Sequence, residues 1–501
     1  MAEEIIMAFS LIFELNNFLF LCFGVAVGII VGCLPGLTAT MALALLVPFT
    51  FTMPPTQGLI MLGGIYIGAM YGGAIPATLI NTPGTPSAIA TTLDGFPLTK
   101  KGMAQHALVT AAFASTIGGI IGTFFLLFLS PPLARVALQF GPTEYLWAAI
   151  FGLTIIATLS TESIFKGIIG GALGLLMSTI GIAPIGGDPR FTFGLPGLQG
   201  GVELIVALIG FFSLPQVLES IEEKHFHQAV HDFRPQFRVN FQVIGQLLRK
   251  PALLIRSAII GTIIGIIPGA GGNIASLVAY NEAVRWSDHP EEFGRGTIDG
   301  VAASESANNA VVPGALMPLL TLGIPGSPAA AVILGSLLLH GLRPGPALYT
   351  EHGVITYAFI LSLFVSSFVM LAFGLLGSQW FARMINFPMS YLAPLITFLS
   401  VIGTYAIRNN FIDVIIMVLF GLLGHITRKL GFQPGPIVLG LILGPIAEQG
   451  LVQGMIIGRA RGSLLAMFFT RPLSLVLIVL CLISALWPII AKGLQRRQQH
   501  A

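Results

Sequence analysis

The chain has 501 residues, of which 55% are hydrophobic and only 9% are charged. Soluble proteins carry about 25% charged residues, so the composition excludes a water-soluble globule and, for the same reason, intrinsic disorder. The formal net charge is only +3, which excludes a nucleic-acid-binding surface. We therefore expect an all-α polytopic protein in a lipid bilayer. At about 20 apolar residues per span, the chain has room for about 10–12 transmembrane helices.

The positions of the basic residues bear on orientation. The chain opens with Glu3 and Glu4, and its first basic residue is Lys100. Basic residues then gather at 100–101, in the segment 220–256 and near the C-terminus, and such clusters mark cytoplasmic loops. We expect these three regions in the cytoplasm and the N-terminus on the other side.

Four pairs of matching segments indicate an internal duplication. In chain order, the pairs are 28–36 with 261–269, 76–88 with 318–330, 142–146 with 388–392, and 174–176 with 421–423. The order is kept, and the spacing drifts only slightly, from 233 residues between Pro35 and Pro268 to 242 between Pro83 and Pro325. Duplicated membrane proteins are commonly transporters whose substrate site lies where the repeats meet.

The duplication predicts the domain organisation. We expect a first repeat over 1–219, a cytoplasmic linker over 220–250, a second repeat over 251–448, and a C-terminal span with a cytoplasmic tail over 449–501. If the second repeat starts in the cytoplasm and the first starts outside, the repeats are inverted, which is the arrangement we expect.

Each half begins with a Pro-Gly break in an apolar helix. Pro35-Gly36 is followed by Thr38, and Pro268-Gly269 is followed by a glycine pair and Asn273. Carbonyl groups exposed at such breaks are candidate ligands for a coupling cation, and Thr38 and Asn273 are candidate substrate ligands.

Two further breaks predict re-entrant hairpins, around 73–92 and 312–340. In each, two prolines flank a glycine, so the segment cannot continue as a helix. The free N–H groups and hydroxyls of such breaks suit an anion such as a carboxylate. The alternative is a pair of ordinary surface loops. The candidate substrate ligands are Asn81, Thr82, Pro83, Gly84, Thr85 and Ser87 in the first break, and Gly323, Pro325, Gly326 and Ser327 in the second.

One acidic residue lies in an apolar stretch of the second half. Glu305 is followed by Ser306, Asn308 and Asn309. An acid inside a span is a functional-site hypothesis by default, and here it would carry a proton or help to bind a cation. The alternative, a glutamate at a helix end near the membrane surface, is equally compatible with the sequence.

The sequence lacks the motifs of metal binding, ATP hydrolysis and intramembrane proteolysis. The three cysteines have neither metal-ligand spacing nor a disulfide framework, and we expect no transition-metal site and no cofactor. No Gly-Lys dipeptide is present for a P-loop, so energy would come from a gradient of Na⁺ or H⁺. An intramembrane protease is an alternative function, but HExxH and the other motifs of such proteases are absent. We therefore expect that the protein is not an enzyme. A passive anion channel would share the hairpins.

Several motifs together resemble the large membrane subunit of the tripartite tricarboxylate transporters, the TctA family. They lie at 32–37, 66–68, 71–73, 81–84, 93–95, 190–193 and 305–309, so the resemblance covers nearly the whole chain. It implies uptake of a di- or tricarboxylate across the bacterial inner membrane by a symporter driven by Na⁺ or H⁺.

The resemblance also implies two partners, a small four-helix membrane subunit and a periplasmic substrate-binding protein. It further implies an elevator-like motion of the part that bears the hairpins. The sequence Thr85-Pro86-Ser87 departs from some citrate-transporting relatives at the presumed site. Citrate, a dicarboxylate and another organic acid therefore remain open as substrates.

Overall fold

The computed structural model describes residues 2–158, 163–222, 237–269, 271–385 and 387–499, and the chain forms two compact units. Unit 1 comprises 1–134 and 216–407, and unit 2 comprises 135–215 and 408–501. Each unit draws on both halves of the chain, so it is a different division from the repeats, whose boundaries stay a prediction. Much of the expected 220–250 linker, residues 223–236, lies outside the described residues.

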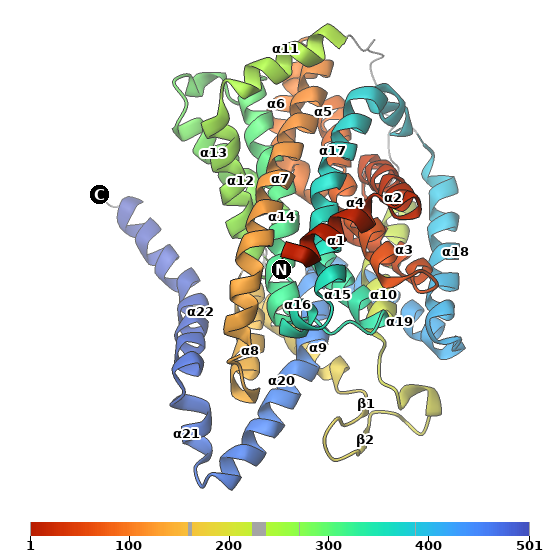
Figure 1. The fold of residues 1–501 in the computed structure, drawn as a ribbon, viewed down its shortest axis with the longest axis vertical. Coiled ribbons are helices and arrows are strands. Elements are labelled where there is room, and N and C mark those ends of the chain that lie inside the picture. The colour runs from red at the N-terminus through yellow and green to blue at the C-terminus, as the bar shows by residue number, and fades with distance from the viewer. Residues whose placement is uncertain (1, 159–162, 223–236, 270, 386, 500–501) are drawn as a thin grey trace. The chain divides into compact units, whose positions relative to one another are not determined.

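Unit 1 is helical (Figure 1). Its helices are α1 Ala2–Ile12, α2 Leu15–Cys33, α3 Ala39–Thr50, α4 Pro55–Gly72, α5 Ala74–Ile80, α6 Ile89–Lys100, α7 Ala104–Ala137, α11 Phe237–Leu248, α12 Pro251–Ile266, α13 Gly271–Arg285, α14 Ile298–Leu322, α15 Pro328–Leu339, α16 Pro346–Thr350, α17 Gly353–Met384 and α18 Met389–Arg408. Short 3₁₀ turns lie at η1 Pro86–Ala88 and η3 Pro290–Glu292.

Unit 2 holds the remaining elements. They are α8 Pro142–Thr158, α9 Ile164–Ser178, β1 Gly181–Ile182, β2 Pro189–Arg190, η2 Pro196–Leu198, α10 Leu204–Glu222, α19 Phe411–Lys429, α20 Pro434–Ala460, α21 Leu464–Phe469 and α22 Pro472–Gln499. The strands β1 and β2 pair antiparallel, with Gly181 opposite Arg190. Helices α7, α10 and α18 contain the points where the chain passes between units.

Seven helices within the described residues are long and apolar enough to cross a membrane. They are Leu15–Cys33, Pro55–Ile80, Ala104–Ala137, Gly353–Met384, Ser390–Arg408, Phe411–Lys429 and Pro434–Ala460. Six shorter apolar helices of 10–17 residues accompany them, among them α3, α12 and α15. Length alone therefore supports a multi-pass membrane protein with fewer full spans than the 10–12 expected, because the Pro-Gly breaks divide several apolar stretches.

Glycines let helices of unit 1 pack backbone to backbone. In α2, Gly24, Gly28 and Gly32 face backbone carbonyls of α4. Glycines of α4 in turn face backbone carbonyls of α2. In the second half, Gly261 and Gly265 of α12 face α14 in the same way. The pairs α2–α4 and α12–α14 lie side by side (Figure 1). Glycines spaced four residues apart lie on one face of a helix, which allows this close packing.

Candidate functional site

Two helices of unit 1 end at equivalent positions of the repeats. Helix α5 ends at Ile80 and is followed by Asn81 with φ 59°, and α14 ends at Leu322 and is followed by Gly323 with φ 74°. Asn81 and Gly323 are 242 residues apart, the spacing of the two Pro-Gly motifs. Asparagine and glycine are the residues that most readily adopt this left-handed conformation. We call the segments 81–87 and 323–327 the first tip and the second tip.

The earlier Pro-Gly breaks also match. Helix α2 ends at Cys33 and α12 ends at Ile266, and each is followed by a glycine in the left-handed region, Gly36 at φ 87° and Gly269 at φ 82°. The chain then turns into α3, where the Thr38 side chain accepts a hydrogen bond from the N–H of Met41 (3.2 Å), and into α13. The predicted helix interruptions are therefore present at all four places.

Each tip packs closely on the broken helix of its own repeat. A Cβ at Gly84 would overlap the carbonyl oxygen of Gly32, and one at Gly326 would overlap that of Gly265. The N–H of Gly269 also donates to the carbonyl of Gly326 (3.0 Å). Only glycine allows such close approach, so both tips pack a glycine against a backbone carbonyl of the preceding broken helix.

The first tip has one hydrogen bond within itself and another with α13, a helix of the second half of the chain. The hydroxyls of Thr85 and Ser87 are 3.0 Å apart, and Ser276 donates to the carbonyl of Ser87 (2.8 Å). Thr85 and Ser87 are buried. Asn81 and Thr82 are exposed instead, so the structure gathers only part of the predicted ligand set here.

The second tip makes its polar contact with α4 of the first repeat. The hydroxyl of Tyr66 lies 2.8 Å from that of Ser327, which also caps α15 by accepting from the N–H of Ala330 (3.1 Å). Each tip thus contacts a helix of the other repeat. Tyr66 carried no predicted role beyond its place in a family motif.

Glu305 is the eighth residue of α14 and is fully buried. It does not lie at a helix end, as the alternative interpretation of the sequence required. Its carboxylate accepts from the Thr91 hydroxyl of α6 and from the Ser115 hydroxyl of α7 (3.0 Å). The side-chain N–H of Asn308 lies 3.4 Å away. All three partners are neutral, so they stabilise the charge without cancelling it.

The neighbours of Glu305 point to different places. Ser306 donates to the carbonyl of Leu254 on α12 (3.0 Å), away from Glu305. Both side-chain polar atoms of Asn309 are buried and have no partner within the described part of the chain. Asn308 therefore lies beside Glu305, whereas Ser306 and Asn309 make no hydrogen bond to it; the coupling role of these residues stays a prediction.

Asp94 is a buried acid to which the residues alone assigned no role. Its carboxylate accepts from the N–H groups of Gly296 (2.7 Å) and Thr297 (3.1 Å), at the start of α14, and from the hydroxyl of Tyr280 (2.9 Å). The helix dipole favours an acid at this end. Asp94 therefore ties the helix that follows the first tip to α13 and α14.

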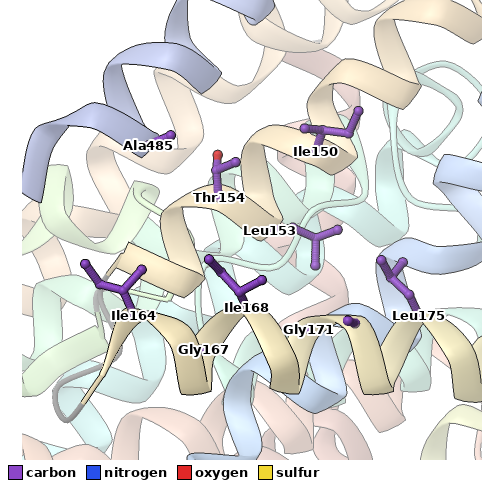
Figure 2. A pocket seen from close by; sticks show the side chains of 10 residues that line it. Ile150, Leu153, Thr154, Ile164, Gly167, Ile168, Gly171, Leu175 and Ala485 are labelled. Carbon is purple, nitrogen blue, oxygen red and sulfur yellow. The ribbon is translucent and has the colours of Figure 1, made fainter.

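Unit 2 contains a separate apolar cavity of about 370 Å³ between α8 and α9 (Figure 2). Its lining includes Ile150, Leu153, Ile168 and Leu175, with Thr154 as a polar member. None of the predicted ligands lies there, and the lining does not suit a carboxylate. In the described ranges, no three His, Cys, Asp or Glu side chains gather as a metal site.

Comparison with known proteins adds a family. Residues 18–439 match the tripartite tricarboxylate transporter TctA family. An Agrobacterium vitis protein, described as an uncharacterized 52.8 kDa protein in the TAR-I ttuC′ 3′ region, is 36% identical over 93% of each chain. A second from that organism, described by the TAR-II ttuC′ 3′ region, is 36% identical over 46% of this chain and 94% of its own length. No solved structure matches the chain.

Proposed function

The chain belongs to the tripartite tricarboxylate transporter TctA family, and from this premise we propose that it is the large permease subunit of a system that imports an organic di- or tricarboxylate. The family is one of transporter components, so the chain is a transport protein and not an enzyme. In the proposal, it works in the bacterial inner membrane with a small four-helix membrane subunit and a periplasmic substrate-binding protein.

The observation that carries the proposal is the fully buried carboxylate of Glu305, held by neutral partners and tied through Thr91 to the helix after the first tip. A buried charge without a counter-charge is costly, and binding of Na⁺ or H⁺ removes that cost. Thr91 lies four residues after the first tip, in the helix that follows it. In the proposal, a cation bound at Glu305 therefore acts through α6 on the segment that binds the substrate. This connection supports cation-coupled symport.

The substrate site is proposed at the tips. Thr85 and Ser87 supply buried hydroxyls, and α13 begins beside Ser87. Hydroxyl and N–H donors bind a carboxylate without the desolvation cost of a buried Arg or Lys. A cation bound nearby lowers the energy of the multiply charged anion in a medium of low dielectric constant.

Movement of the substrate is proposed to follow an elevator mechanism between inverted repeats. The matched breaks at Gly36 and Gly269, and at Asn81 and Gly323, support two repeats of one design. Both tips belong to unit 1, so one compact body carries the whole proposed site. In the proposal this body moves across the membrane, and the tips are re-entrant hairpins.

The test is uptake by membrane vesicles that contain the full three-component system. A panel of radiolabelled di- and tricarboxylates is offered with a Na⁺ gradient, an H⁺ gradient or neither. We expect at least one carboxylate to accumulate above its external concentration with only one of the two gradients. Equilibration that ignores both gradients identifies a passive channel, and absence of any carboxylate flux contradicts the proposed function.

A further inference from the structure

Tyr66 and Asn308 occupy equivalent positions in the two repeats. They are 242 residues apart, the same spacing as Pro83 and Pro325 in the tips. Tyr66 lies on α4 and faces the second tip, and Asn308 lies on α14, near the first tip. The two positions therefore allow the surroundings of the tips to be compared directly.

The polar side chains at the second tip form hydrogen bonds with groups of the protein. The Tyr66 hydroxyl is bonded to Ser327, and the Ser327 oxygen also accepts from the N–H of Ala330. Both side chains are buried. These polar groups already satisfy each other, so they have no need of a ligand.

At the first tip, the equivalent residue is left with an unused acceptor. The side-chain N–H₂ of Asn308 lies 3.2 Å from the carbonyl of Met70 and 3.4 Å from the carboxylate of Glu305. These two acceptors determine which end of the amide is nitrogen. The opposite atom, Oδ1, is buried and has no partner among the residues that the structure describes. Leaving a buried acceptor without a partner costs free energy, which a hydrogen-bond donor on a ligand would recover.

The unused oxygen faces the beginning of α13. A Cβ built on Gly272, the second residue of this 15-residue helix, would lie 2.9 Å from Asn308 Oδ1 and 2.7 Å from the Cβ of Ser87. A side chain at Gly272 would therefore overlap its neighbours, and glycine allows α13, α14 and the first tip to lie in direct contact. The first N–H groups of a helix have no partner inside it and attract anions.

We propose that the start of α13, together with Asn308 and the first tip, is a substrate subsite that recognises a hydroxyl group. The second tip has no equivalent subsite. The carboxylate of the ligand lies at the N–H groups that begin α13, and a hydroxyl on the neighbouring carbon donates to Asn308 Oδ1. A carboxylate oxygen cannot satisfy Oδ1, because both atoms are acceptors, whereas a hydroxyl can. The substrate class is thus a 2-hydroxycarboxylate. This inference rests on the proposed uptake of carboxylates and makes it more specific.

Because Oδ1 is closed to solvent, the first tip has to move for the ligand to enter. Gly84 packs on Gly32 without a side chain of its own, and Ser87 is joined to α13 by one hydrogen bond, which the Ser276 hydroxyl donates to the Ser87 carbonyl. Displacement of this tip opens the subsite while the second tip keeps its Tyr66–Ser327 contact.

The test uses the full-length protein in lipid nanodiscs and a pair of ligands that differ by one hydroxyl, malate and succinate. We expect the wild type to bind malate about three- to tenfold more tightly, as one hydrogen bond provides. In Asn308→Leu the preference falls to about one. In the matched variant Tyr66→Phe, at the equivalent position of the other repeat, the preference is unchanged.

A second variant changes the α13 side of the subsite and leaves Glu305 and Asn308 in place. Gly272→Ala adds a methyl group against Asn308 Oδ1 and Ser87, and we expect both ligands to bind at least about tenfold more weakly. The control is Gly245→Ala in α11, where an added Cβ meets nothing within 4 Å. It should bind both ligands as the wild type does.

The outcomes separate the two proposals. Equal affinity of the wild type for malate and succinate, a comparison that needs no variant, overturns the subsite and leaves carboxylate uptake standing. A preference that survives Asn308→Leu also overturns it. Failure of the wild type to bind either ligand, combined with absence of carboxylate uptake in vesicles, overturns both.

Discussion

The hydroxyl of Thr91 donates to the carboxylate of Glu305, so the helix that follows the first tip is bonded to a fully buried acid in the second repeat. The Ser115 hydroxyl of α7 holds the other carboxylate oxygen at 3.0 Å. Three helices, α6, α7 and α14, therefore meet at one carboxyl group. In the proposed mechanism, a cation bound there acts on α6 and, through it, on the first tip.

The glycines of the two tips should be equally intolerant of a side chain. Gly84→Ala and Gly326→Ala each place a methyl group against the carbonyl of a neighbouring helix. We expect each to lower the free energy of unfolding by about 1–3 kcal/mol, because the tip has to shift. Thermal unfolding in lipid nanodiscs measures the effect.

Gly171→Ala in α9 serves as the control for both variants. An added Cβ there lies at an ordinary 3.6 Å from Leu153, and alanine favours a helix, so stability should be unchanged or raised. If Gly84→Ala is as stable as this control, the close approach at the first tip does not exist.

Asp94 and Tyr280 should stabilise the protein as a coupled pair. Their side chains are hydrogen-bonded at 2.9 Å, and Asp94 also accepts from the N–H groups of Gly296 and Thr297, just before α14. In a double-mutant cycle with Asp94→Ala and Tyr280→Phe, we expect a coupling energy of about 1–3 kcal/mol, as for hydrogen bonds to charged groups. Strictly additive unfolding free energies would show that the two side chains do not interact.

The exposed end of the first tip should change its access to reagents during transport. In a chain whose cysteines Cys22, Cys33 and Cys481 are replaced by Ala, Thr82→Cys offers one thiol in the tip. We expect labelling by a membrane-impermeant maleimide to change severalfold when substrate and coupling cation are added. The cause is the proposed movement of the re-entrant hairpin.

Arg461→Cys in the same background is the control. Arg461 is exposed and belongs to unit 2, outside the body that we propose to move, so labelling there should not depend on substrate. Thr82→Cys that is labelled from one side at a constant rate, with or without substrate, would identify the first tip as an ordinary surface loop.

The backbone breaks could be predicted from the sequence because their cause is local. Proline lacks an N–H and clashes with the preceding turn, so two prolines around Gly84, or around Gly326, end a helix in any surroundings. Repetition at Pro35-Gly36 and Pro268-Gly269 strengthened the prediction. The glycines spaced by four residues in α2 and α12 are equally local in their effect, since their spacing places them on one helix face.

The partners of the buried polar residues could not be predicted in the same way. Glu305 was conspicuous as an acid in an apolar stretch, yet Thr91 and Ser115 are 214 and 190 residues away in sequence. Asn308 and Tyr66 differ in chemistry although the repeats place them at equivalent positions. Which polar group finds a partner depends on tertiary packing, and no local pattern encodes it.

The role of the exposed Asn81 as a substrate ligand stays a prediction. The structure shows its place in the backbone, where it ends α5 with a positive φ of 59°. Asparagine is common at such positions for backbone reasons. A motif therefore located the tip correctly but did not separate the residues that shape it from those that face inward.

The most direct test of the account is accumulation of carboxylate by Glu305→Gln in vesicles with the full system and an imposed cation gradient. The wild type, and the control Glu291→Gln at an exposed site, should concentrate the substrate above its external level. Glu305→Gln should let it equilibrate without concentrating it, because the neutral amide no longer binds the cation. Accumulation by Glu305→Gln equal to that of the wild type would contradict the central role of this buried acid.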